Sequence, residues 1–363
     1  MPYLRNRVKP EIEIIWKNVD SIYIDDAFLI NEISFNSYII NSGSSRLLVL
    51  NGSYNDGREL IKLIRGNYKY VLIGGQSPYS WGALKFLEGQ DVQVIASRRK
   101  IKEMISFTKA ERIDWIDVND EEEINLGGDK ITIKVSGEII CSIFKSYIFS
   151  PYIGSTIMPL SLSIYDQQYS VNEIEKGLRK FFSINLNNKR FDLFNLLRRI
   201  EFNNVIAIFP FHGPIITSVK SFLKLLTDLV KVKEKVVVTY PPFYDVSNII
   251  VGELLKVISG SGLKVSQISS LNVVDFLAEA VDSSGIIYII SYIPYLSSIS
   301  NTLITASKRY SIDENKVIAK IHLIVDSYKV EDEGVKIYGI PNQRDLEAIK
   351  DLGRNLVRAL SSS

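Results

Sequence analysis

The sequence predicts two domains of different α/β architecture: a β-sandwich covered by helices, followed by a doubly wound parallel sheet. The chain has 363 residues and 46% apolar residues, enough for two hydrophobic cores. Its first part is rich in short strands separated by Asn, Gly and Ser, whereas its last part alternates strands with helices. We therefore expect one domain over residues 1–232 and a second over residues 233–363.

Residues 10–50 predict antiparallel hairpins, because β-branched and aromatic residues recur in short runs. These runs are EIEIIW, SIYIDDAFLI, NSYIINSG and SRLLVLNG. A helix over 56–66, a buried strand in KYVLIGG and a helix starting near Trp81 follow. The strand VQVIAS and a helix from about Arg98 come next. The segment EEEINLGGDKITIKVSG predicts two strands joined at Gly127-Gly128.

Residues 170–203 are predicted to be helical, and residues 205–211 form an apolar strand that ends in the turn HGPI. The helix after this turn has one apolar face and ends in the lysine-rich KVKEK, which suits a helix C-terminus and a short linker. Residues beyond it alternate strand and helix and predict right-handed βαβ units. The expected segments are KVVVTY, NIIVGELLKVISGSG, KVSQIS, VVDFLAEAVDSSG, IIYIIS, KVIAKIHLIVD and a terminal helix in NQRDLEAIKDLGRNLVRAL.

Composition limits the function classes. The formal net charge of +2 is too balanced to indicate a nucleic-acid partner. The single cysteine, Cys141, cannot form an internal disulfide, so we expect a reducing cytoplasm. The charged N-terminal stretch does not resemble a signal peptide, and the longest uncharged apolar run, 285–296, is too short for a membrane span. The chain has only two histidines, His212 and His322, which argues against a metal site built from several imidazoles.

The order of these segments resembles the flavodiiron proteins. The strand NSYIIN, the hairpin INLGGDKITI, the turn FHGPI and the C-terminal IPNQRDLEAIKDLG carry the resemblance over nearly the whole chain. It implies a metallo-β-lactamase-like αββα sandwich followed by a flavodoxin-like domain, shortened here. It also implies an ancestral activity, the reduction of oxygen or nitric oxide by two irons and FMN.

The metal ligands implied by this resemblance are largely replaced. The family's first metal loop reads H-x-E-x-D-H-S-G-A-L, and its ligand positions fall here on Gly75, Ser77, Tyr79 and Ser80. A later histidine is expected near residues 136–142 and a bridging aspartate near Tyr152, and neither is present. Only His212 matches a family ligand, so we expect it to be a relic and we expect no iron.

The flavin loops are also degenerate by comparison with the family. After the first strand of the second domain, Pro241 and Pro242 remove N–H donors, Asp245 adds a negative charge and Ser247 keeps one hydroxyl. In the second loop, Tyr295 is an aromatic residue that could stack on a flavin ring. The third flavin loop and its helix are expected to be missing. We therefore expect no FMN.

Most remaining features have an ordinary structural interpretation. His322 is expected to be structural, and His212 is either structural or a relic. Tyr79, Tyr152 and Trp81 fill the former metal cavity or line an apolar pocket. The basic run 97–104 and the acidic run 117–123 are expected to face water, although the first could contact phosphate or RNA. Nothing near Cys141 supplies a base for nucleophilic catalysis.

The leading hypothesis is a non-catalytic homologue that serves as a binding or structural subunit. The resemblance implies a homodimer paired head to tail, and pairing with an active paralogue stays open. Two alternatives are an oxidoreductase that acts on oxygen or nitric oxide through an altered cofactor site, and a nucleic-acid-associated protein.

Overall fold

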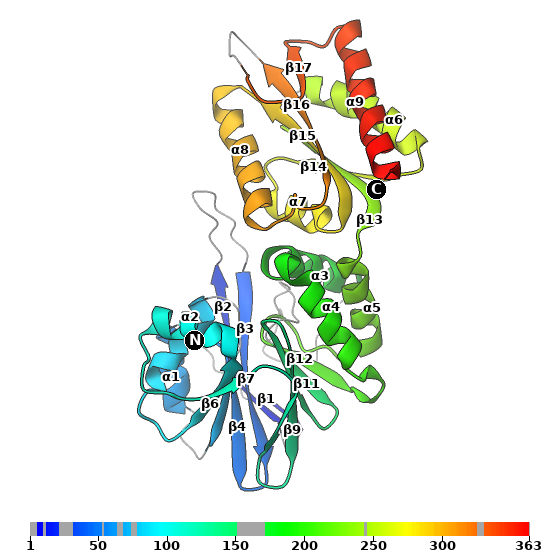
Figure 1. The fold of residues 1–363 in the computed structure, drawn as a ribbon. Helices are drawn as coiled ribbons and strands as arrows, with labels where there is room; N and C mark the ends of the chain where they lie inside the picture. Colours follow the sequence, from blue (N-terminus) through cyan, green and yellow to red (C-terminus); the bar gives the residue numbers. More distant parts are fainter. Residues whose placement is uncertain are drawn as a thin grey trace. The chain divides into compact units, whose positions relative to one another are not determined.

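The computed structural model describes residues 6–9, 12–21, 32–52, 54–63, 68–73, 78–150, 171–242, 245–324 and 330–362. These residues form two compact units (Figure 1). The first contains the described residues up to Tyr23, then Ile30–Phe181 and Lys189–Thr227, and the second contains Phe182–Asn188 and Asp228–Ser363. No helix among the described residues is both long and apolar enough to cross a membrane.

The first unit contains a seven-stranded sheet in which the strands lie in sequence order. Its strands are β1 (Asn6–Lys9), β2 (Ile12–Ser21), β3 (Glu32–Ser42), β4 (Ser45–Leu50), β5 (Tyr70–Ile73), β6 (Gln93–Ser97) and β7 (Asp114–Val118). Strands β1 to β4 are antiparallel, and β4 to β7 are parallel. The parallel connections are α1 (Tyr54–Leu63), the 3₁₀ helix η1 (Pro78–Phe86) and α2 (Arg98–Thr108).

A second sheet of five strands completes the sandwich, in the order β12-β11-β10-β9-β8. Its strands are β8 (Glu122–Asn125), β9 (Lys130–Ser136), β10 (Ile139–Phe144), β11 (Tyr147–Ser150) and β12 (Ala207–Pro210). The predicted hairpin at Gly127-Gly128 is confirmed. Asn125 Oδ1 accepts both glycine N–H groups, and the positive φ angles of 85° and 134° require glycine there.

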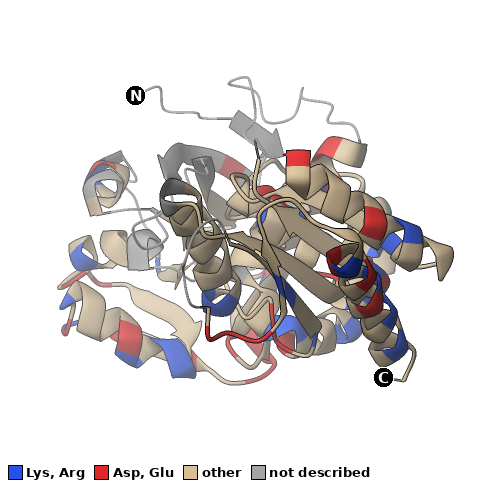
Figure 2. Ribbon diagram, turned by 90° about the horizontal axis from the view of Figure 1, so that it is seen from above, with Lys and Arg blue, Asp and Glu red and all other residues tan. Residues whose placement is uncertain are grey.

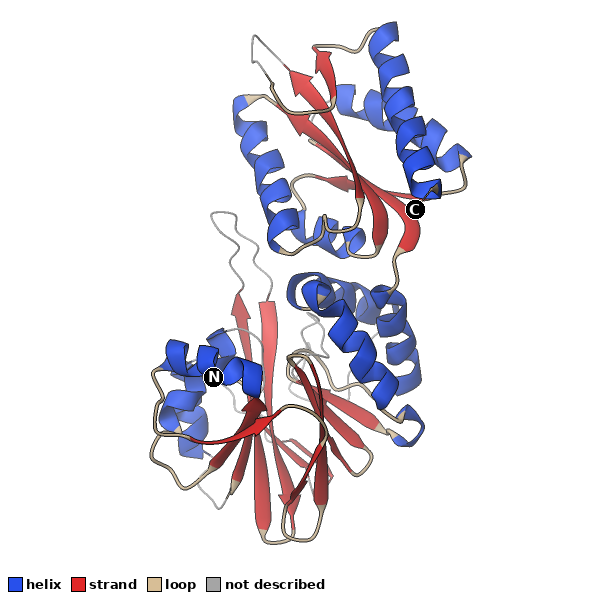
Figure 3. Cartoon of the chain, in the orientation of Figure 1, coloured by secondary structure: helices blue, strands red, loops and turns tan. Residues whose placement is uncertain are grey.

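Among the described residues, four helices lie between β11 and β12 along the chain and a fifth follows β12. Figure 3 colours the helices blue. They are α3 (Val171–Asn185), η2 (Asn187–Lys189), α4 (Arg190–Arg199), η3 (Phe202–Asn204) and α5 (Val219–Val230). An aromatic cluster connects the two sheets: Tyr38 of β3 packs edge-on against Phe149 of β11 and Phe209 of β12, which stack on each other at 4.9 Å. These buried rings bring the end of β12 next to β3.

The second unit is a five-stranded parallel sheet in the order β14-β13-β15-β16-β17. Its strands are β13 (Lys233–Tyr240), β14 (Lys264–Ser269), β15 (Ser283–Ser291), β16 (Val317–Ile324) and β17 (Val335–Tyr338). Helices α6 (Asp245–Gly260) and α9 (Gln343–Ser361) pack on one face, and α7 (Val273–Ala280) and α8 (Pro294–Arg309) cover the other. This strand order is that of flavodoxin-like sheets, so the predicted fold class is confirmed.

Three elements differ from the prediction. Helix α8 is not among the expected elements, although Pro294 in its first turn is a helix-start signal. Strand β17 is not among them either, because its four residues are too short for a clear alternation. The helix expected from Trp81 is a 3₁₀ helix that begins at Pro78. Most of the strand expected in SIYIDDAFLI, and residues 325–329 where the third flavin loop would begin, lie outside the described residues.

Candidate functional site

The loop that carries His212 is held by side-chain amides from the opposite sheet. Asn36 of β3 donates from Nδ2 to the carbonyl oxygens of Pro210 at 3.0 Å and Gly213 at 2.6 Å. Asn51, which follows β4, donates from Nδ2 to the carbonyl oxygen of Phe211 at 2.8 Å. The backbone carbonyl groups on both sides of His212 are therefore fixed by hydrogen bonds.

The His212 side chain is itself largely enclosed. It is 8% exposed, and its ring centroid lies 5.4 Å from that of Phe181 in α3. Gly213 adopts a φ of 86°, a value that glycine adopts without strain, so the chain can turn directly after the histidine. The imidazole is a buried member of a rigid loop.

Asn51 contributes a second feature to this region. Its backbone exchanges two hydrogen bonds of 2.9 Å with the Ser37 hydroxyl, so the residue is fixed in place. Its Oδ1 atom is buried and has no hydrogen-bond partner among the described residues.

The predicted vacated positions are only partly visible. Gly75, Ser77 and Tyr152 lie outside the described residues. Tyr79 and Ser80 belong to η1, and their side chains are likewise not described. Trp81, in the same helix, is 2% exposed and joins the hydrophobic core of the first unit, with its ring 6.3 Å from that of Phe107.

The described donors near His212 do not by themselves make up a two-iron site. The described residues contain no group of three or more His, Cys, Asp or Glu side chains that could hold a metal ion. One imidazole and an amide oxygen provide too few of the imidazole and carboxylate ligands that iron requires. These residues therefore support no metal-dependent step.

The second unit has its own candidate site at the carboxyl ends of β13 and β15. Ligands of doubly wound sheets bind where the strand order reverses, which is between these two strands. Pro241 and Pro242 follow β13, and Asp245 is the first residue of α6. Ser247, in the first turn of α6, is 1% exposed, and its hydroxyl has no hydrogen-bond partner among the described residues.

His322 lies near the same edge, and both of its ring nitrogens have hydrogen-bond partners. Its Nε2 lies 2.9 Å from the carbonyl oxygen of Glu333, so we assign the proton to Nε2. Its Nδ1 then accepts from the Tyr292 hydroxyl at 3.0 Å. Burial, together with the charge of nearby Asp332, raises the pKa of Tyr292. These contacts account for His322 without any ligand.

The described residues of this edge do not by themselves fit the phosphate of FMN. The two prolines lack N–H donors, and the Asp245 carboxylate would repel a dianion at the start of α6. The buried Ser247 hydroxyl is one compatible donor. Tyr295 belongs to α8, and its side chain is not described. One hydroxyl is too little to hold a dianion, so these residues support no flavin-dependent step.

The other residues singled out from the sequence have local partners. Burial raises the pKa of Cys141 to about 12, so its thiol is not a nucleophile near neutral pH. In the basic run, Arg98 pairs with Asp117, and Lys100 lies 2.7 Å from Glu103 and 3.3 Å from Glu138.

In the acidic run 117–123, Glu123 lies 2.7 Å from Lys130, and Asp120 pairs with Arg199. Figure 2 shows acidic and basic residues side by side along the helices.

Sequence reasoning missed the amides that hold the His212 loop. Asn36 lies in the strand SFNSYII, and Asn51 directly follows the apolar run LLVL. An asparagine in such a strand signals a buried hydrogen bond. Its partners lie more than 150 residues away, because Asn36 and Pro210 are separated by 174 residues. Sequence spacing could not identify them.

Comparisons with known proteins establish the fold. No family model and no curated protein matches the chain. Among solved structures, rubredoxin oxygen:oxidoreductase from Desulfovibrio gigas superposes with a TM-score of 0.80 at 16% identity, covering 99% of each chain. A flavodiiron protein from Giardia intestinalis has a TM-score of 0.76 at 12% identity, covering 99% of this chain and 97% of its own.

A mutant of the flavodiiron protein from Thermotoga maritima has a TM-score of 0.74 at 17% identity and covers 98% of each chain. These likenesses extend over both units, so the chain has the complete two-part fold of these proteins. At such low identities these likenesses show the fold alone. The chemistry of this chain has to be argued from its own residues.

Proposed function

We propose that this chain, which has the flavodiiron fold, is a non-catalytic homologue that acts as a binding or structural subunit in the cytoplasm. The fold extends over both units, whereas most of the cofactor ligands implied by the family resemblance are replaced in the sequence. A protein that kept its packing and lost its cofactor ligands would still present the surfaces through which its relatives assemble.

The main observation in support of this proposal is the small number of histidines. The whole chain has two histidines, and they lie in different units. His322 is hydrogen-bonded through both ring nitrogens to Tyr292 and Glu333, which leaves His212 as the only imidazole of the first unit. A single imidazole supports neither a diiron site nor a histidine-rich zinc site.

We expect natively purified protein to be colourless and to contain well below one equivalent of iron, zinc and manganese per chain. Visible absorption and elemental analysis of one sample measure both quantities. The variant His212→Asn is the matched control, because it should leave the metal content unchanged. A metal content near two equivalents that falls in His212→Asn would contradict the proposal.

The buried hydroxyl of Ser247, which has no partner within the described part of the chain, favours one alternative, an oxidoreductase that keeps flavin with an altered site. This buried donor lies at the edge where doubly wound sheets bind ligands. A flavin absorption band in the purified protein, lost in Ser247→Ala, would place this alternative first.

The third hypothesis, association with nucleic acid, is weakened because Arg98 and Lys100 already pair with carboxylates.

We also propose that the chain forms a homodimer, paired head to tail as the family resemblance implies, and that an active paralogue can replace one copy. Size-exclusion chromatography with light scattering should give about twice the chain mass of 41.1 kDa. A mass equal to one chain across the micromolar range would exclude the homodimer. Mixing experiments with a tagged paralogue test the second arrangement.

A further inference from the structure

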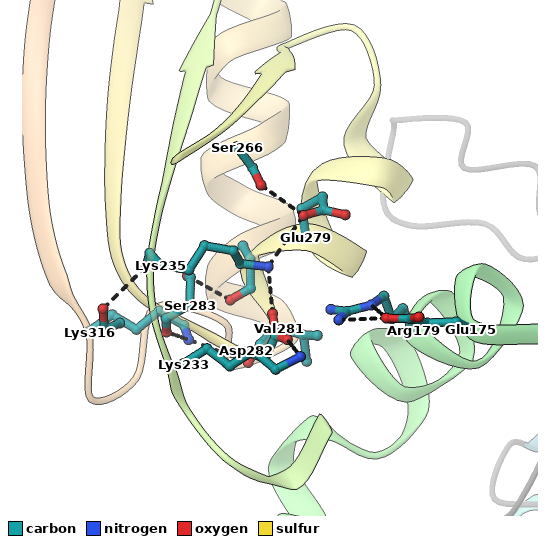
Figure 4. A network of polar contacts seen from close by, with 12 residues as sticks. Glu175, Arg179, Lys233, Lys235, Ser266, Glu279, Val281, Asp282, Ser283 and Lys316 are labelled. Atoms are coloured by element: carbon teal, nitrogen blue, oxygen red, sulfur yellow. Dashed lines mark hydrogen bonds and ion pairs between the residues drawn. The ribbon is translucent and has the colours of Figure 1, made fainter. Parts of the chain in front are cut away.

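We draw no further inference here: the strongest candidate, the hollow at the amino ends of β13 and β15 in the second unit, carries none, because Lys233, which borders it, is already paired with the buried Asp282 (Figure 4) and nothing in the described part of the chain shows what covers its aliphatic side chains.

Discussion

Asp282→Asn is expected to lower the free energy of unfolding of the second unit by about 3–5 kcal/mol. Asp282 is 0% exposed and lies 2.6 Å from Lys235 Nζ and 2.9 Å from Lys233 Nζ. Lys235 is 7% exposed, and its next carboxylate, that of Glu279, is 3.3 Å away. Removing the aspartate charge leaves a buried ammonium group with one more distant carboxylate. Urea unfolding followed by circular dichroism measures the loss.

Two further variants separate the buried charge from general damage. Glu347→Gln removes an exposed carboxylate 2.8 Å from Lys350, and it should change stability by less than about 1 kcal/mol. Lys235→Met in the Asp282→Asn background should recover part of the loss, because it removes the unpaired charge. Additive losses in the double variant would show that the two groups are not coupled.

Gly57→Ala is expected to destabilise the first unit by about 2 kcal/mol. Gly57 lies inside α1, where alanine would ordinarily be the better helix former by about 1 kcal/mol. A Cβ atom at this position would overlap both Cα and Cβ of Ala83 in η1. The two helices therefore contact each other directly at Gly57, and the added methyl group forces them apart.

Tryptophan fluorescence measures this effect selectively, because Trp16, Trp81 and Trp115 all lie in the first unit. The matched control is Gly252→Ala in α6, where an added Cβ would meet no atom within 4 Å. That change should stabilise the second unit by about 0.5–1 kcal/mol, as seen by circular dichroism. Equal effects of the two substitutions would show that propensity, not contact, decides the outcome.

The fold class and the small number of histidines are readable from the amino-acid sequence alone. The spacing of apolar residues and the residue types found in turns are local properties of the sequence. They therefore indicate directly the hairpin at Gly127-Gly128 and the alternation of strands and helices after Lys233. The count of two histidines likewise needs no structure. Elements with weak local signals, such as β17 with its four residues, escape this reasoning because neighbouring strands stabilise them.

The surroundings of each residue, by contrast, depend on how the chain packs in three dimensions. The amides of Asn36 and Asn51 reach the His212 loop across the sandwich, over 160 residues or more along the chain. The contact of Gly57 with Ala83 and the sharing of Asp282 by two lysines depend on how helices and strands pack. Such contacts depend on distances in space, which the periodicity of a single chain does not encode.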